Sequence, residues 1–305
     1  MRKRLFIGTR GSKLALVQTE QVLEMMRKLE PDVKYEIVPI RTKGDKLHDL
    51  GNTAVEGKSM FTKEIEEALL SAKVDVAIHS MKDLTTDLPE GLVIAAVPRR
   101  VDARDVLVAR SGIMFKELQS GARIGTSSSR RRAQILAARK DLEMVEMRGN
   151  VDTRLRKLES GEYDAIVLAA AGLLRLGLDG KVTEYLSMDL MLPAVGQGAI
   201  AIQARENDQE TKNLVSPLDH EPTRSAIEAE RAFARKLGAD CHNPVAAHAE
   251  VESGRLTLDG LVATPDGQQI VRSQIMSDSL NAEQVGEELA ELLLSKGAAT
   301  ILEVA

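Results

Sequence analysis

The sequence predicts an α/β protein with two similar domains, followed by a smaller C-terminal α+β domain. Three observations support this fold class. Short apolar runs alternate with helical patterns through the first two-thirds of the 305 residues, a motif at residues 7–12 recurs at residues 124–129, and the last third changes to alternating strand patterns framed by helices. Strands that alternate with helices are typical of a mostly parallel sheet covered by helices. We therefore expect a ligand cleft between the two α/β domains.

The first domain begins with a regular series of strands and helices. Ser12 is placed to cap a helix that ends near Leu29. The segments predicted with it are the strands Leu5–Gly8, Tyr35–Ile40 and Val74–Ile78 and the helix Thr62–Ser71. The twenty residues 41–60 lack periodicity, and unstructured loops of that length are usually lids, binding loops or disordered segments. We expect a mobile lid there.

The second domain repeats this order, and the third departs from it. Ile124-Gly125-Thr126-Ser127-Ser128-Ser129 echoes Ile7-Gly8-Thr9-Arg10-Gly11-Ser12, and each motif ends a strand and opens a helix. The third domain is predicted from a helix at Pro222–Leu237 with Gly238 as its C-cap, strand patterns at 245–251 and 256–258, a hairpin turn at Asp266-Gly267, and a final helix from the Asn281-x-x-Gln284 capping box to Gly297.

Composition excludes several classes of function. The chain has 41 Lys and Arg against 46 Asp and Glu, no Trp, 3 Tyr and 4 Phe, so neither its charge nor its aromatic content suits a nucleic-acid surface. Its single cysteine excludes an intramolecular disulfide framework and a thiolate-clustered metal site. No apolar run approaches the roughly 20 residues of a membrane span, and the basic N-terminus lacks the apolar stretch of an export signal. We expect a cytoplasmic protein.

The charge is unevenly distributed along the chain. Residues 121–180 hold 9 Arg and 2 Lys against 4 Asp and 4 Glu, a net charge of +3, so the remainder carries −8. A small arginine-rich region on an acidic protein suits a compact acidic ligand. Solvated helix faces would produce the same composition, and both interpretations stay open.

The two echoed turns are candidate anion sites, because a helix N-terminus exposes unpaired N–H groups and a partial positive charge. Ser12 and Ser128 could instead only cap their helices, and for Ser12 alone we favour the cap. The second turn runs into Arg130-Arg131-Arg132, and three guanidiniums on the first helical turn oppose the helix dipole, which favours an anionic ligand there. Neither turn has the spacing of a phosphate P-loop or of a dinucleotide-binding motif.

Candidate chemical groups follow several predicted strands. Asp83, after the strand Val74–Ile78, is either a positioned acid or base or a turn residue, and we expect His79 to be a buried, hydrogen-bonded histidine. Five arginines recur at one edge of the second predicted sheet: Arg130, Arg131, Arg148, Arg154 and Arg175. The glycines of Leu192–Ala199 suit either a hinge or an ordinary loop. Cys241 lies in a short polar loop, where a reactive thiol and a buried apolar residue are both possible.

Taken together, these residues resemble the porphobilinogen deaminase family from about Leu5 to Gly297. Five long motifs occur in the family's order, which argues strongly against chance agreement. The stretches that carry the resemblance are Thr9-Arg10-Gly11-Ser12-x-Leu14-Ala15-Leu16, Ala77-Ile78-His79-Ser80-Met81-Lys82-Asp83, Gly125-Thr126-Ser127-Ser128-x-Arg130-Arg131, Arg148-Gly149-Asn150-Val151-x-Thr153-Arg154, Leu192-Pro193-Ala194-Val195-Gly196-Gln197-Gly198 and the cysteine loop Gly238–Pro244.

The resemblance implies three domains. The first comprises residues 1–98 with 194–217 and includes the lid at 41–60, the second is the arginine-rich part at 99–193, and the third, residues 218–305, carries the cysteine. The first two resemble the halves of a periplasmic-type binding protein.

The resemblance also implies the reaction, which is the head-to-tail condensation of four porphobilinogen molecules into linear hydroxymethylbilane with loss of ammonia. The product grows on a dipyrromethane cofactor that a thioether joins to the cysteine, here Cys241. Asp83 matches the family's catalytic aspartate. Each pyrrole carries an acetate and a propionate, and the residues that match carboxylate-binding positions are Arg10, Ser12, Lys58, Lys82, Thr126, Ser127, Ser128, Arg130, Arg131, Arg148, Arg154, Arg175 and Gln197. We expect a monomer without a metal.

Two rival functions remain at this stage. A non-enzymatic solute-binding protein for a di- or tricarboxylate would explain the cleft, the lid and the arginines, but it would give Cys241 and the third domain no task. A nucleic-acid regulator would use the basic region, and the net charge of −5 and the scarce aromatics oppose it.

Overall fold

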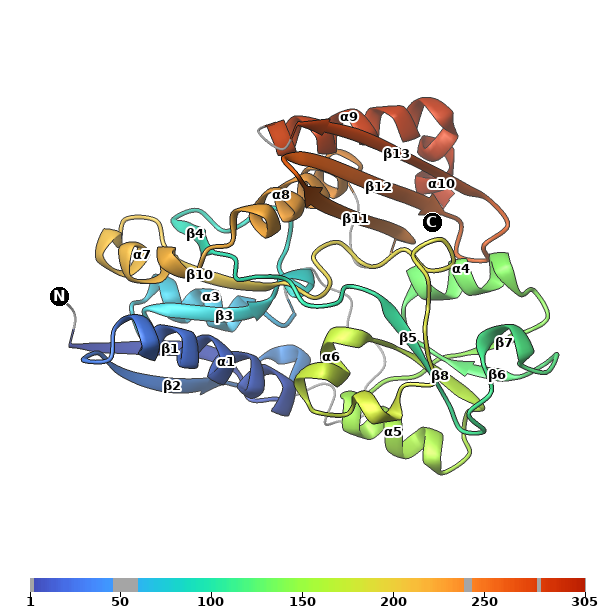
Figure 1. The fold of residues 1–305 in the computed structure, drawn as a ribbon, viewed down its shortest axis with the longest axis horizontal. Helices are drawn as coiled ribbons and strands as arrows, with labels where there is room; N and C mark the ends of the chain where they lie inside the picture. Colours follow the sequence, from blue (N-terminus) through green and yellow to red (C-terminus); the bar gives the residue numbers. More distant parts are fainter. Residues whose placement is uncertain (1–2, 46–59, 239–242, 279–280, 305) are drawn as a thin grey trace. The chain divides into compact units, whose positions relative to one another are not determined.

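The computed structural model of the chain describes residues 3–45, 60–238, 243–278 and 281–304. The chain divides into two compact units, Met1–Val101 with Ala199–Arg224, and Asp102–Gly198 with Ser225–Ala305. The described residues form two five-stranded sheets with helices and one three-stranded sheet (Figure 1), which confirms the predicted α/β class with a smaller α+β part.

The first unit is built on a mixed sheet with the strand order β2-β1-β3-β10-β4. Its strands are β1 (Arg4–Arg10), β2 (Lys34–Ile40), β3 (Val76–Ser80), β4 (Leu92–Ala96) and β10 (Ile200–Arg205). The strand β1 is parallel to β2 and β3, whereas β10 is antiparallel to β3 and β4. The carboxyl ends of β1 and β3 therefore lie at one edge of the sheet, which brings Arg10 and the residues after Ser80 to the same place.

Helices α1 (Lys13–Leu29), α3 (Lys63–Leu70) and α7 (Gln209–Val215) complete this unit. The predicted cap of α1 is confirmed, because the Ser12 hydroxyl oxygen accepts a hydrogen bond from the Ala15 backbone N–H at 3.3 Å. The buried face of α1, with Val22 and Met26, joins Ile7 of β1 in one apolar cluster. Burying this face removes apolar surface from water, which is the main stabilising contribution to the unit.

The second unit contains a sheet with the order β7-β6-β8-β5-β9. Its strands are β5 (Asp105–Ala109), β6 (Arg123–Gly125), β7 (Glu143–Val145), β8 (Ala165–Ala169) and β9 (Glu184–Tyr185). Because β6 is parallel to β7 and β8, the carboxyl ends of all three share one edge, and the helices α4 (Ser129–Ala138), α5 (Val151–Glu159) and α6 (Ala170–Arg175) follow them. The strand β5 runs antiparallel to β8.

The smaller sheet of this unit is antiparallel and has the order β11-β12-β13. It consists of β11 (Val245–Glu252), β12 (Arg255–Ala263) and β13 (Ile270–Asp278), flanked by the helices α8 (Glu221–Lys236) and α9 (Ala282–Leu293). Phe233, Leu258 and Leu289 are fully buried in its core. None of the helices in the described part of the chain is long and apolar enough to cross a membrane.

One expectation for the C-terminal helix was wrong. Asn281 precedes α9 but its side chain accepts no capping hydrogen bond, so the predicted capping box does not form. The predicted stop at Gly297 is confirmed, because that residue takes a non-helical φ of 101° and separates two helices. The helix that ends there is not the last one, since α10 (Ala299–Val304) follows it.

The hairpin turn between β12 and β13 makes a close contact with α4. Gly267 has a φ of +69°, and a Cβ atom there would overlap the Ala133 carbonyl oxygen and lie 2.8 Å from the Ala137 backbone nitrogen. Only glycine satisfies both the conformation and the space. The tip of the small sheet therefore rests on the helix that carries Arg130 and Arg131.

Candidate functional site

The candidate site of the first unit centres on Arg10, at the end of β1. Its Nη2 and Nε donate hydrogen bonds to Asp45 Oδ1 at 2.6 and 3.2 Å. Its Nη1 lies 3.7 Å from Asp83 Oδ2, and its guanidinium carbon lies 4.1 Å from the centre of the Phe61 ring. One cation is thus shared between two carboxylates and an aromatic face.

The sequence did not identify Asp45 as a site residue, because Asp45 lies in the segment 41–60 that we expected to be a lid. The Thr42 backbone N–H and hydroxyl both donate to Asp45 Oδ2. Burial alone would raise the pKa of Asp45, but the bonds from Arg10 and Thr42 outweigh it and lower the pKa below its ordinary value. The Thr-x-x-Asp spacing was the available signal.

Asp83 is held less tightly than Asp45. It ends the short 3₁₀ turn η1 (Met81–Asp83), directly after β3. The 3.7 Å separation from Arg10 is too long for a hydrogen bond, and 28% of the Asp83 side chain is exposed. Its oxygens therefore remain available to a ligand. Lys82, beside it, is exposed.

His79 does not act as a base in this arrangement. It is buried, and its Nε2 lies 3.1 Å from Gln203 Oε1, which confirms the expected buried, hydrogen-bonded histidine. Burial lowers the pKa of His79 to about 4, although the bond to Gln203 acts in the opposite direction. The imidazole is therefore neutral near pH 7, with Nε2–H donating to the glutamine oxygen.

In the second unit, the turn after β6 caps α4. The Ser128 hydroxyl oxygen accepts from the Arg131 backbone N–H at 3.4 Å, and Thr126 Oγ1 accepts from the Ser128 N–H at 3.1 Å. Each hydroxyl can still donate its own proton to an anion. Ser127 is exposed beside them.

A buried carboxylate lies between the first two arginines of α4. Asp105, which is fully buried, accepts from Arg130 Nη1 at 2.7 Å and from Arg131 Nη2 at 2.6 Å. From the sequence we expected both arginines to bind a ligand, and Asp105 was not identified as their partner. Both guanidiniums are themselves buried, with 5% and 6% of each residue exposed.

Arg154 and Arg175 differ from that pair. Arg154 Nε donates to the Gly149 carbonyl at 2.7 Å and Arg175 Nη2 to the Gly198 carbonyl at 2.9 Å, and neither forms an ion pair within the described ranges. Arg175 Nε is buried without a hydrogen-bond partner there. Burial lowers the pKa of each guanidinium to about 10, and the charge of Arg131 contributes for Arg154. An anionic ligand would compensate both charges.

The remaining predicted residues lie in varied surroundings. Arg148 is about half exposed and pairs with Glu146 at 2.6 Å. Gln197 is buried and donates to the Ala103 carbonyl at 2.7 Å and to Asp105 Oδ1 at 3.0 Å. Lys58 and Cys241 lie outside the described residues. Within the described ranges, no cluster of three or more His, Cys, Asp or Glu could hold a metal ion.

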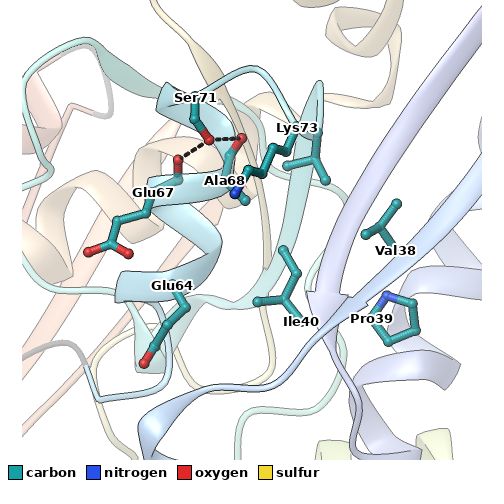
Figure 2. A pocket seen from close by; sticks show the side chains of 9 residues that line it. Val38, Pro39, Ile40, Glu64, Glu67, Ala68, Ser71 and Lys73 are labelled. Atoms are coloured by element: carbon teal, nitrogen blue, oxygen red, sulfur yellow. Dashed lines mark hydrogen bonds between the residues drawn. The ribbon is translucent and has the colours of Figure 1, made fainter.

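A separate pocket lies in the first unit, between β2 and α3 (Figure 2). Val38, Pro39 and Ile40 form one wall, and Glu64 and Glu67 lie on the other. The pocket includes none of the predicted site residues, and its charged lining is the two carboxylates and the ammonium group of Lys73.

Comparison with known proteins gives a consistent result along the chain. Residues 5–213 match the family model described as "Porphobilinogen deaminase, dipyromethane cofactor binding domain", and residues 225–295 match "Porphobilinogen deaminase, C-terminal domain". The porphobilinogen deaminase of Syntrophotalea carbinolica is 50% identical over 298 residues, covering 98% of this chain and 95% of its own. That of Carboxydothermus hydrogenoformans is 48% identical over 303 residues, covering 99% and 97%.

Among solved structures, the similar chains are distant. The periplasmic aliphatic sulphonate binding protein SsuA of Escherichia coli has a TM-score of 0.43 at 18% identity, covering 77% of this chain and 70% of its own. The methionine binding protein MetQ has a TM-score of 0.43 at 14% identity, covering 71% and 89%.

Proposed function

The chain belongs to the porphobilinogen deaminase family, and from this premise we propose which of its residues carry the reaction. It is a hydroxymethylbilane synthase, which condenses four porphobilinogen molecules head to tail with release of ammonia, in tetrapyrrole biosynthesis. Its N-terminal part binds a dipyrromethane cofactor.

The observation that carries the residue assignment is the pair Arg154 and Arg175. Each pyrrole of the substrate and of the cofactor carries two carboxylates, and these two partly buried guanidiniums have no carboxylate partner in the described part of the chain. The buried, unpartnered Nε of Arg175 is the donor that such a ligand would satisfy. We assign both arginines to pyrrole carboxylates.

Other groups at the same edge would extend this carboxylate site. The hydroxyls of Thr126, Ser127 and Ser128 and the N-terminus of α4 supply neutral donors. At this edge of the second unit we also assign Arg130, Arg131, Arg148 and Gln197. In the first unit we assign Arg10 and Lys82, while Ser12 already caps α1 and keeps its hydroxyl proton for a ligand. Lys58, which lies outside the described residues, is assigned from the family resemblance.

We assign the catalytic carboxylate to Asp83. Loss of ammonia from the aminomethyl group leaves a cation conjugated with the pyrrole, and a fixed carboxylate that accepts the pyrrole N–H stabilises that charge as it develops. The same oxygens can receive and return protons as ammonia leaves and the new carbon–carbon bond forms. The open hydrogen-bonding capacity and partial exposure of Asp83 support this role, whereas Asp45 is already committed to Arg10 and Thr42.

We further propose that Cys241 is the attachment point of the cofactor. When bound, the dipyrromethane supplies the pyrrole carbon to which the first substrate unit is joined. A thioether suits this task, because it stays intact while the finished product is released. The cysteine would belong to a third domain, residues 218–305, and the separate apolar core around Phe233, Leu258 and Leu289 supports that partition. The first two domains would then be residues 1–98 with 194–217, and residues 99–193.

Intact-protein mass spectrometry tests this assignment. Protein produced in cells that supply porphobilinogen should carry the added mass of a dipyrromethane on the peptide that contains Cys241, and after denaturation it should react with Ehrlich's reagent for pyrroles. Cys241→Ser keeps size and polarity but offers a poorer nucleophile, so it should yield folded, pyrrole-free protein. A bare Cys241 peptide in the wild-type protein would contradict the attachment and favour the solute-binding rival.

The oligomeric state and the location belong to the same proposal. Every group assigned above comes from one chain, so we infer a monomeric enzyme, which light scattering would test. A thiol that must stay free to form a thioether suits a reducing compartment, so we infer the cytoplasm. Fractionation of cells that express the tagged chain would test this location.

A further inference from the structure

We propose that Asp105 is a positioning residue, an internal counter-ion that turns Arg130 toward a ligand carboxylate while it neutralises Arg131. This inference rests on the proposed function, because it takes Arg130 of α4 to contact a pyrrole carboxylate. Asp105 lies outside all of the motifs that follow the carboxyl ends of the strands. The support comes from the register of β5, the donor count of the two guanidiniums and the burial of the group.

The register explains how a carboxylate reaches this edge. Asp105 is the first residue of β5 and lies opposite Ala169, the last residue of β8. Because β5 is antiparallel, its amino end meets the carboxyl ends of β6 and β8. An acidic side chain thus enters the edge at which the second sheet places its arginines.

The carboxylate is fully used by the protein. Oδ1 accepts from Arg131 Nε at 3.1 Å, from Arg131 Nη2 at 2.6 Å and from Gln197 Nε2 at 3.0 Å, while Oδ2 accepts from Arg130 Nη1 at 2.7 Å. Burial alone would raise the pKa of Asp105, but the two guanidiniums outweigh it and hold the pKa well below its usual range. The cluster of two cations and one anion keeps one positive charge.

The donor count separates the two arginines. Arg131 donates to Asp105 through both Nε and Nη2, and its Nη1 donates to the Val167 carbonyl at 2.9 Å. Arg130 is held through Nη1 alone, which donates to Asp105 and to the Leu192 carbonyl, both at 2.7 Å. Its Nε and Nη2 have no partner in the described part of the chain. The Nε and Nη2 atoms of an arginine can together donate two parallel hydrogen bonds to one carboxylate, so this side of the Arg130 guanidinium is open to a ligand.

Two substitutions test the role of Asp105. Asp105→Asn removes the charge, and Asp105→Glu keeps the charge but moves the carboxyl group by one methylene. Each full-length variant is produced with a porphobilinogen supply, and cofactor loading is measured by intact mass per folded molecule. Displacing a binding group by about 1 Å costs up to about 100-fold, so we expect loading about tenfold to 100-fold below wild type in the Asn variant and an intermediate loss in the Glu variant.

A second readout distinguishes positioning from general support of the fold. Without its internal carboxylate, the cluster in Asp105→Asn should bind an external oxyanion, so inorganic phosphate should raise the thermal midpoint of this variant by more than it raises that of the wild type. Asp141→Asn is the matched control, because Asp141 also receives two bonds from one guanidinium, at 2.7 Å each from Arg139, on an exposed surface. It should load normally and respond to phosphate as the wild type does.

Each outcome is decisive. Wild-type loading per folded molecule in Asp105→Asn would overturn the inference, and the same result in Asp105→Glu would do so if the Asn variant does not fold. A phosphate effect in a folded Asn variant no larger than that in the wild type would also overturn it. If the wild-type protein itself carries no pyrrole, the proposed attachment fails first, and Asp105 loses its assigned task with it.

Discussion

The two echoed turns of this chain share a backbone and differ in charge. At residues 7–12 and 124–129, a strand ends, a serine caps a helix and the hydroxyl oxygen accepts from the N–H three residues on. The first turn places one guanidinium, Arg10, against two carboxylates. The second places Arg130 and Arg131 against one, with further arginines nearby.

Under the proposed function, the difference assigns two chemical tasks to one structural motif. An excess of carboxylate charge suits a site where a cation develops and protons move, and an excess of guanidinium charge suits a site that holds anionic ligands. The strand-to-helix turn supplies position only. The residues next to it determine the sign of the field that a ligand meets.

The largest expected effect is a loss of unfolding free energy when an arginine of the second turn is removed. Arg131→Leu leaves Asp105 buried with a single cation, and removing one partner of a buried ion pair costs about 3–5 kcal/mol of unfolding free energy. Chemical denaturation would measure this loss. The exposed neighbour Arg132 gives the control, since Arg132→Leu should change the unfolding free energy by less than about 0.5 kcal/mol. Equal losses in the two variants would contradict the assigned charge cluster.

The next effect concerns turnover in the first unit. Asp83→Asn keeps the shape of the side chain and removes its charge, so kcat should fall by about 100- to 1,000-fold while the unfolding free energy stays near wild type. Steady-state assays with porphobilinogen measure the change, with the exposed Glu90→Gln as the control. Wild-type rates in Asp83→Asn would show that this carboxylate is not the catalytic one.

A third effect is a pH dependence that we expect from the first unit and not from the Asp105 cluster of the second unit. His79 has a pKa of about 4 in the folded chain and near 6.5 when unfolded, so the unfolded state binds more protons between these values. The stabilisation is complete above pH 6.5 and is lost as the pH falls toward 4, by at most about 1.4 kcal/mol per pH unit. Asp105, with a pKa well below its usual range, stays ionised over this window.

Denaturation curves at pH 7, 6 and 5 measure this effect in wild type and in His79→Gln. The variant should lose part of the pH dependence, because it lacks the titrating group. The same slope in both proteins would show that another group accounts for the acid sensitivity.

The smallest effect tests what the turns share. Ser12→Ala and Ser128→Ala each remove one N-cap, and each should lower the unfolding free energy by about 1 kcal/mol. Serine-to-threonine variants, which keep the hydroxyl, should recover most of it. If the two alanine variants differed by more than the cost of one cap, the turns would not be equivalent scaffolds.

The caps and most strands could be predicted because their signals are local. Ser12 and Ser128 stand directly before apolar helical patterns, and the hairpin at Asp266-Gly267 is a two-residue motif. The positions of Asp45 and Asp105 depend on tertiary structure instead. Asp105 is 25 residues from Arg130, and only the antiparallel register of β5 brings the two together. A search limited to the carboxyl ends of strands misses an acid at an amino end.

The C-terminal helix shows a second limit of local signals. Asn281 has the residue type of a helix start, yet its side chain makes no capping bond, whereas Gly297 interrupts the helical residues as expected. The helix α9 forms without its side-chain cap because Leu289 is buried in the core of the small sheet, and tertiary packing contributes more to helix stability than terminal residue types do. The further helix α10 was not predicted, and Ile301 anchors it in the same core.

The contact of Gly267 with α4 has a practical consequence for anyone who modifies this enzyme. The small sheet has two hairpin turns, and at Gly254, the turn between β11 and β12, nothing lies within 4 Å of a would-be Cβ atom. A fluorophore or a short epitope tag inserted after Ser253 should therefore leave the protein intact. The same insertion after Asp266 would push the hairpin off the helix that carries Arg130. The turn at Gly254 is the place for a reporter, and the turn at Gly267 has to keep its length.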